Sequence, residues 1–182
     1  MNRIFAKISL LVLGLLLLAP QLSAQFPGPT GSTTVAVTIG PSAGLTVTNS
    51  STPLTMSVSN PGVFTGSTLL TYYVRTSTTG GSGSITLKVT SDFSPSGGPS
   101  VAKPLSPGDG LKYTCSVSGP GTACTGTQTS STTAVTPIAS FGTNAHTSPS
   151  GSTATTNWSL ANDPLYQTGS YTATIIFTIS AS

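Results

Sequence analysis

Charged residues are scarce in this sequence, which has six Lys and Arg, three Asp and no Glu among its 182 residues. The cations beyond residue 24 are Arg75, Lys88, Lys103 and Lys112, and they are too scattered to form a basic patch. Binding to nucleic acid or to an anionic membrane therefore has no electrostatic support. Serine and threonine supply 62 residues, so hydroxyl groups must carry most of the hydration of the folded chain.

The residue types that usually perform catalysis are equally rare. His146 is the single histidine and lies in a polar loop sequence, so a hydrolase that uses it with one of the many serines is a remote alternative. Asp92, Asp109 and Asp163 each lie in a turn rich in Ser, Pro and Gly, where capping of backbone amides explains them better than paired-carboxylate catalysis or a calcium site. We expect no enzyme, no cofactor and no metal site.

The N-terminal residues have the layout of a secretory signal peptide over 1–24. A basic start precedes an apolar run over 8–19, and Ala24 is a small residue at the expected cleavage position. The run is short against the ~20 residues that span a bilayer, so we expect no membrane span in the mature chain. The sequence then predicts a flexible Pro/Gly-rich leader over 25–34 and a single domain over 35–182. The expected location is the periplasm, the medium or the surface of a bacterial cell.

Beyond residue 24 the apolar residues alternate with polar ones, and a 3.6-residue period is missing. The clearest strand is the last one, where Tyr171, Ala173, Ile175, Phe177 and Ile179 alternate mainly with threonines. Shorter segments of strand character lie at 35–39, 45–47, 54–58, 69–74, 85–90, 111–115 and 134–141. Seven to nine short strands predict an all-β, immunoglobulin-like antiparallel β-sandwich, with a small β-barrel as the alternative.

Three details refine this prediction. The segment 69–74 is apolar on both faces, which is typical of a central strand. Pro137 cannot donate to a sheet ladder, so its strand should be an edge strand or carry a bulge. Low-complexity loops are expected near 91–110 and 125–156.

Two cysteines, Cys115 and Cys124, flank the turn sequence Gly119-Pro120-Gly121. In an exported protein a close, even pair of cysteines predicts a disulfide, here across a hairpin. The eight residues between them do not match a CxxC redox motif, and a second pair that could complete a zinc site is missing.

Aromatic side chains suggest a second function class. Trp158 and Tyr166 could stack on a glycan, which would make the chain a carbohydrate-binding module. Trp158 lies next to an alternating apolar run, so a role as core or inter-sheet filler is favoured for it.

The ending Gly169-Ser170-Tyr171, followed by a threonine-rich alternating strand, resembles the last strand of bacterial pilins and spore-coat-U-like surface subunits. The resemblance implies an incomplete immunoglobulin-like sandwich that a strand from the next subunit completes. The implied pairing residues are Val35, Val37 and Ile39 of the donor and Tyr171, Ile175, Phe177 and Ile179 of the last strand. The segment 35–39 could equally be the first strand of its own chain's sandwich.

We therefore expect a secreted, non-catalytic structural or adhesive surface protein. Its partners would be other copies of itself, other surface subunits bound through sheet-edge pairing, or a glycan.

Overall fold

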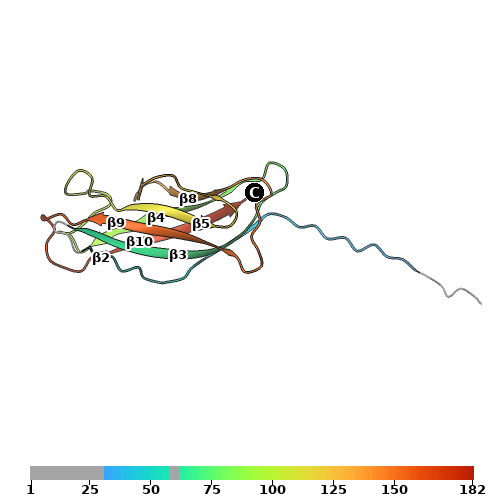
Figure 1. Cartoon of the computed structure of the whole chain (residues 1–182), viewed down its shortest axis with the longest axis horizontal. Helices are drawn as coiled ribbons and strands as arrows, with labels where there is room; N and C mark the ends of the chain where they lie inside the picture. The colour runs from blue at the N-terminus through green and yellow to red at the C-terminus, as the bar shows by residue number, and fades with distance from the viewer. Residues whose placement is uncertain (1–30, 58–61) are drawn as a thin grey trace, which may run out of the picture. The chain divides into compact units, whose positions relative to one another are not determined.

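The computed structural model describes residues 31–57 and 62–182, and the regular structure in this part of the chain is entirely β-strand (Figure 1). The chain divides into two units, and the second, Thr38–Ser182, holds every strand. The predicted signal peptide and residues 25–30 of the leader lie outside the described residues. Within the described ranges, a helix long and apolar enough to cross a membrane is not found.

The first sheet has six antiparallel strands in the order β1-β3-β9-β5-β7, with β2 also paired to β3. These strands are β1 (Ser42–Val47), β2 (Thr55–Met56), β3 (Val63–Arg75), β5 (Lys112–Ser118), β7 (Gln128–Thr129) and β9 (Ser152–Ala161). The long strand β3 is a central strand of this sheet. β1 and β2 pair with one of its edges, and β9 pairs with the other.

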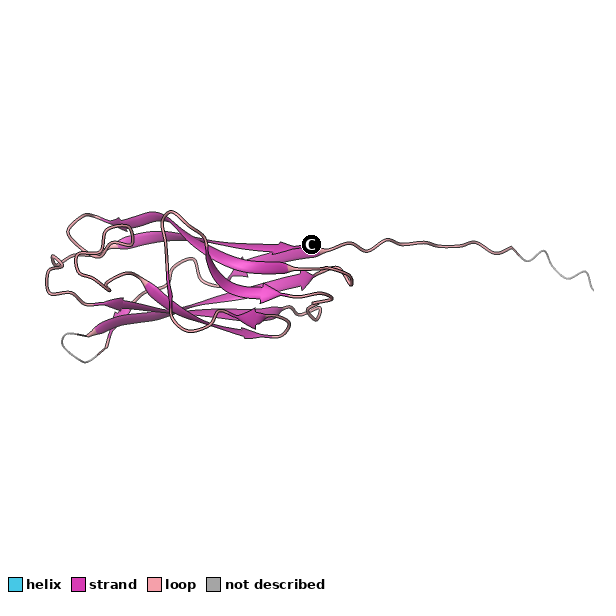
Figure 2. Cartoon of the chain, turned by 90° about the horizontal axis from the view of Figure 1, so that it is seen from above, coloured by secondary structure: helices cyan, strands magenta, loops and turns pink. Residues whose placement is uncertain are grey.

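The second sheet has four antiparallel strands in the order β10-β4-β8-β6. They are β4 (Gly83–Ser94), β6 (Thr122–Ala123), β8 (Thr136–Phe141) and β10 (Thr172–Ala181), and Figure 2 shows the strands of the domain in two layers. The all-β sandwich is therefore confirmed. Pro137 lies where the pairing of β4 with β8 shifts register, so the predicted irregularity at this proline is confirmed as well.

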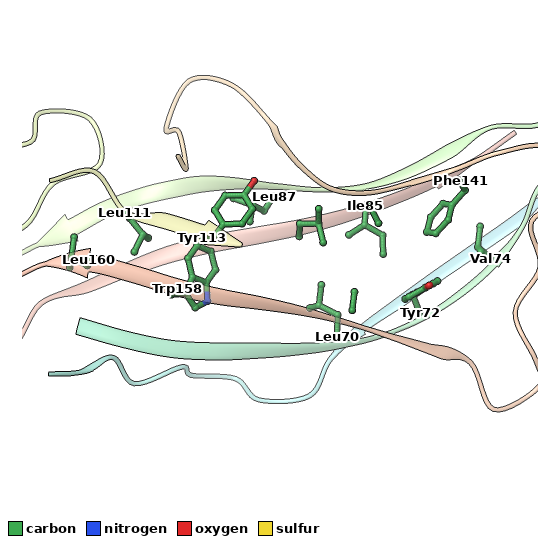
Figure 3. Close-up of a cluster of buried hydrophobic side chains, with 13 residues drawn as sticks. Leu70, Tyr72, Val74, Ile85, Leu87, Leu111, Tyr113, Phe141, Trp158 and Leu160 are labelled. Carbon is green, nitrogen blue, oxygen red and sulfur yellow. The ribbon is translucent and has the colours of Figure 1, made fainter. Parts of the chain in front are cut away.

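Alternate residues of the facing strands fill the space between the sheets, as the two-residue period of a strand requires. Figure 3 shows side chains of both sheets pointing into this core. The largest contributions come from Leu70, Tyr72 and Val74 on β3, Ile85, Leu87 and Val89 on β4, Tyr113 on β5, Ile138 and Phe141 on β8, and Trp158 and Leu160 on β9. The rings of Tyr113 and Trp158 pack with their centroids 5.4 Å apart, so neighbouring strands interlock in the core.

Three sequence predictions differ from the structure. The segment 35–39 forms no strand, and the first strand begins at Ser42. Alternating apolar residues form a strand only where a sheet edge pairs with them, and a single copy provides no such pairing here. The segment 69–74 is central in its sheet, yet Leu69 and Tyr73 are exposed, so only one of its faces is buried. The expected loop over 125–156 contains β7 and the start of β9, in addition to β8, which the strand character of 134–141 predicts.

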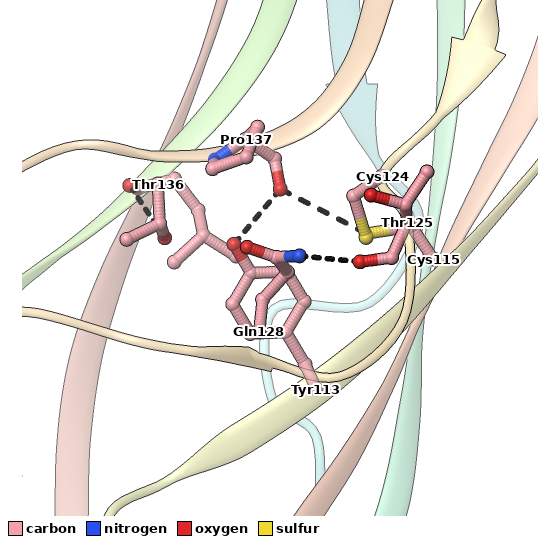
Figure 4. Close-up of a disulfide and its surroundings, with 8 residues drawn as sticks. Tyr113, Cys115, Cys124, Thr125, Gln128, Thr136 and Pro137 are labelled. Atoms are coloured by element: carbon pink, nitrogen blue, oxygen red, sulfur yellow. Dashed lines mark hydrogen bonds between the residues drawn. A yellow bond between two sulfur atoms is a disulfide. The ribbon is translucent and has the colours of Figure 1, made fainter.

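The disulfide between Cys115 and Cys124 is confirmed, but its role differs from the predicted hairpin bridge. Cys115 is in β5 of the first sheet, whereas the backbone N–H of Cys124 donates to Ile138 of β8 in the second sheet, at 2.8 Å. The bond therefore ties the two sheets together, with 5.5 Å between the Cα atoms. Figure 4 shows a second inter-sheet contact beside it, in which the Tyr113 hydroxyl donates to the Pro137 carbonyl at 2.8 Å.

Replacing both cysteines, Cys115→Ser with Cys124→Ser, should lower the free energy of unfolding by roughly 2.5–3 kcal/mol, the loop-entropy value for a ring of about ten residues. Urea unfolding of the mature protein measures the loss. The wild type under reducing conditions should fall by the same amount. An unchanged midpoint in both cases would contradict a structural role for this bond.

Candidate functional site

The sandwich is open along one side, between the free edge of β10 in the second sheet and the β1–β2 edge of the first. A groove of about 1050 Å³ lies there. Its floor is formed by Phe64, Phe93, Leu111, Trp158 and Leu160, and its sides by residues of 47–54 and of 166–177. The opposite side of the sandwich carries the inter-sheet disulfide, so the groove is confined to one side.

The inward side chains of β10 are only half buried along this groove. Ile175, Phe177 and Ile179 pair in register with Val89, Leu87 and Ile85 of β4. The three β4 side chains are at most 1 % exposed, whereas each of their β10 partners keeps part of its surface in water. Burying apolar area is worth about 25 cal/mol per Å², so β10 retains an unused capacity for burial.

Val47 lines the other side of the groove and shows the same deficit. It pairs with the core residue Leu70, yet its own side chain is 40 % exposed. Between β1 and β2 the chain leaves the sheet, and residues 48–54 belong to no strand.

The backbone of β10 is also incompletely paired. Among the described strands β10 pairs only with β4, so alternate N–H and C=O groups on its outer edge are free to pair with another strand. Near Ile179 and Ala181 the strand β1 packs against β10 from the other sheet, and the groove lies against the first half of β10, Thr172 to Phe177. The available edge and the apolar groove therefore lie side by side.

Trp158 belongs to the floor of the groove rather than to an exposed binding face. Its side chain is 4 % exposed, and its Nε1–H donates to the Thr68 hydroxyl at 2.8 Å. The Thr68 hydroxyl also bonds to that of Thr52 at 2.7 Å, which links the floor to the 48–54 segment. The structure thus confirms the core role of Trp158 and leaves it no open face on which a sugar could stack.

One end of the groove is formed by the connection from β9 to β10, residues 162–171. Tyr166 and Tyr171 are half buried in it, and the Tyr171 hydroxyl donates to the Gln167 carbonyl at 2.7 Å. The Tyr171 ring lies against Gly98, where an added Cβ would come within 2.4 Å of the ring. A glycine at this position is therefore needed for the ring to pack.

The connection is held by two aspartates that are far apart in the sequence. Asp163 accepts hydrogen bonds from the Ser106 hydroxyl and the Leu165 amide, and these bonds together with Asp109 lower its pKa. Burial, followed by the hydrogen bond and negative charge of Asp163, raises the pKa of Asp109. Burial and the same two carboxylates raise the pKa of Tyr166 to about 12, so its hydroxyl stays protonated and donates to Asp109 at 3.4 Å.

Asp92 lies in β4 rather than in the predicted turn, but its side chain caps backbone amides as expected. Its carboxylate accepts hydrogen bonds from the amides of Phe93, Val101 and Ala102 and from the Ser100 hydroxyl, at 2.6–3.1 Å. Burial opposes ionisation of this carboxyl, but the four hydrogen bonds outweigh it and lower its pKa. The role of Asp92 is therefore to fold the loop after β4.

The arrangement expected of a hydrolase is not found around His146. Its Nδ1 lies 2.9 Å from the Asn144 carbonyl oxygen, and its backbone bridges to Arg75. Within residues 31–57 and 62–182, no hydrogen bond joins His146 to a serine hydroxyl or a carboxylate. In the same ranges, no group of three or more His, Cys, Asp or Glu could hold a metal ion.

Sequence reasoning placed Tyr171, Ile175, Phe177 and Ile179 on the inward face of one strand. Ile175, Phe177 and Ile179 lie there, whereas Tyr171 precedes β10 and its ring packs against Gly98. Val35, Val37 and Ile39 are 89 %, 81 % and 65 % exposed. The apolar residues opposite β10 and the pairing of Asp109 with Asp163 were not foreseen. Pro53 was the sequence signal for the uncovered apolar residues opposite β10, because a proline interrupts a strand. No sequence signal indicated that Asp109 and Asp163 lie together.

Comparison with known proteins gives no further guide to this site. No family model matches the chain, and neither a curated protein nor a solved structure resembles it significantly.

Replacing Asp92 with Asn should lower the free energy of unfolding by about 1–2 kcal/mol near neutral pH, because charge-assisted hydrogen bonds are lost at a partly exposed site. The pKa of Asp92 is lowered on folding, so its contribution is complete above the ordinary value of 3.8 and is lost as pH falls through the lowered pKa. Thermal unfolding between pH 2 and 7 measures this dependence. Ser100→Ala removes one of the hydrogen-bond donors, so it should lower the free energy of unfolding by less than Asp92→Asn does. Equal stability of Asp92→Asn and wild type at pH 7 would contradict the capping role.

Proposed function

We propose that this chain is a secreted, non-catalytic surface subunit that joins other copies of itself by strand exchange. The segment 33–40 of one copy pairs with the free edge of β10 in the next copy and places its apolar side chains in the groove. One observation supports this proposal above the others: β10 is half buried and unpaired on its outer edge, and the same chain carries an exposed alternating segment.

The chemistry of donor and acceptor matches. Val35, Val37 and Ile39 would lie on one face of an extended segment, with Ala36 and Thr38 on the other. Three β-branched side chains at two-residue intervals suit a groove floored by aromatic and aliphatic residues. Main-chain pairing to a sheet edge gives affinity, and alternate side chains in the groove give specificity. Neither partner needs a charge, in agreement with the charge-poor sequence.

The direction of pairing follows from where the groove lies. β1 begins at Ser42, paired with Arg75, and the Ser182 carbonyl accepts from the nearby Ser77 amide, so β1 begins where β10 ends. A donor parallel to β10 would bring Ile39 to this end, where β1 already packs on β10. A donor antiparallel to β10 brings Ile39 to the beginning of β10, where the groove is. Antiparallel pairing is also slightly more stable per residue.

Antiparallel insertion determines the kind of assembly. The donor's domain then follows beyond the far end of the acceptor, so its Ser42 end meets the Thr172 end of its neighbour. Such a head-to-tail contact uses two different surfaces and does not close on itself, which produces an open filament. Parallel insertion would join two like ends and produce a closed dimer.

The compartment is part of the same proposal. The formed disulfide fits an oxidising environment, and the sequence at 1–24 has the layout of a secretion signal. The resemblance of the last strand to pilin-like and spore-coat-U-like subunits agrees with a role as a structural or adhesive component of a bacterial surface.

The test compares the mature protein with two single variants in the donor segment. Val37→Asp places a charge on the face that enters the groove, and Ala36→Asp places the same charge on the opposite face. Loss of a buried valine is worth about 1.5–3 kcal/mol, so Val37→Asp should weaken assembly at least tenfold. Size-exclusion chromatography with light scattering and negative-stain microscopy measure it. Wild type and Ala36→Asp should form filaments, and Val37→Asp should not.

Two results would overturn the proposal. One is a strictly monomeric wild type at all concentrations, together with no binding of a synthetic 31–41 peptide to protein that lacks those residues. The other is equal loss of assembly in Ala36→Asp and Val37→Asp, which would assign the effect to charge rather than to the groove.

A further inference from the structure

Two exposed leucines lie on the loops at the Thr172 end of the sandwich. These loops are 95–111, which follows the β4 residue paired with Thr172, and 162–171, which leads into β10. Leu105 on the first loop is 49 % exposed, and Leu165 on the second is 67 % exposed. Single exposed leucines are common on protein surfaces, so their significance depends on whether they lie together.

The two leucines flank one carboxylate and therefore do lie together. Asp163 accepts hydrogen bonds from the hydroxyl of Ser106, the residue after Leu105, and from the backbone amide of Leu165 at 2.8 Å. The residue after Leu165, Tyr166, lines the groove. Leu105 and Leu165, called the leucine pair below, are thus beside the end of the groove without lining it.

The opposite end of the domain, where β1 begins, holds the chain just after the donor segment. The Nε–H of Arg75 donates to the Gly40 carbonyl at 2.9 Å, and Arg75 is the residue that pairs with Ser42. A hollow of about 370 Å³ lies at this point, and its lining includes Ile39, Pro41 and Arg75. Because Ile39 is also the last apolar residue of the donor segment, the hollow adjoins the place where a neighbouring copy would begin.

The chain between the two copies is short. In the proposed assembly Ile39 lies in the groove near the beginning of β10, and Ser42 begins the next domain. Three residues span at most about 11 Å, and the Gly40 carbonyl is already bonded to its own domain through Arg75. The end of the donor's domain must therefore meet the loops at the Thr172 end of the acceptor, where the leucine pair offers an exposed apolar surface.

We infer that the leucine pair of one copy packs against the hollow beside Arg75 in the next copy and forms a second contact between the subunits. This inference rests on the proposed function, because insertion of the strand brings these two ends together. Packing removes the leucine side chains from water, which favours association. A single inserted strand would let successive domains tilt at Gly40, whereas a second contact fixes their relative orientation.

Variants on both surfaces test the contact. Leu105→Gln combined with Leu165→Gln makes the leucine pair polar without adding a charge near Asp163. Thr78→Arg places a long side chain in the hollow from an exposed turn that lines it. Val135→Gln is the matched control, because Val135 is 63 % exposed in the loop before β8 and belongs to neither surface.

The first readout is the protein concentration at which filaments form, measured by light scattering. The double leucine variant should raise this concentration about tenfold or more, because the apolar burial is lost. Thr78→Arg should raise it as well, and Val135→Gln should not. Negative-stain microscopy should show that any filaments of the double leucine variant and of Thr78→Arg are more curved than those of wild type.

The second readout is binding of the synthetic 31–41 peptide to each protein without those residues. The affinity should be the same in wild type and all variants, because the peptide carries no domain that could make the second contact. Unchanged peptide binding also shows that each variant is folded.

The outcomes separate this inference from the proposed function. If the double leucine variant and Thr78→Arg assemble at the wild-type concentration, the second contact is wrong and strand exchange stands. If only one of them weakens assembly, the two surfaces are not partners, which also overturns the inference. Peptide binding that weakens as much as assembly would assign the leucines to the groove instead. If wild type neither assembles nor binds the peptide, the proposed function fails and the second contact fails with it.

Discussion

β10 is an edge strand of the second sheet, so it pairs along one side only, and its inward face is incompletely buried. Its inward residues meet the core on one flank, while the other flank borders a groove. The half-exposed Ile175 and Phe177 and the unpaired backbone edge both belong to a strand at the edge of its sheet. The exposed Val47 and the strandless 48–54 segment lie on the other side of the same groove.

The closed side of the sandwich makes this open side possible. Cys115 and Cys124 belong to different sheets, and their bond holds the layers together where the chain crosses between them. A covalent tie on one side allows the other side to stay open without the two sheets separating. The buried pair of Tyr113 and Trp158 packs in the core between these two sides.

Hydroxyl groups, rather than charged groups, make most of the side-chain hydrogen bonds in this chain. Thr68 satisfies the indole of Trp158, Ser106 bonds to Asp163, and Ser100 bonds to Asp92. The few charges that remain are therefore used for specific contacts: Asp92 folds a loop, and Asp109 and Asp163 join two.

The sequence by itself determined the all-β class, the disulfide pair, the inward face of β10 and the capping role of Asp92, because each depends on local alternation or short-range spacing. Only the tertiary structure decided that Cys115 and Cys124 join two sheets and that 35–39 forms no strand. It alone brought Asp163 to Asp109. These outcomes depend on which strands become neighbours, and a two-residue period carries no information about neighbours.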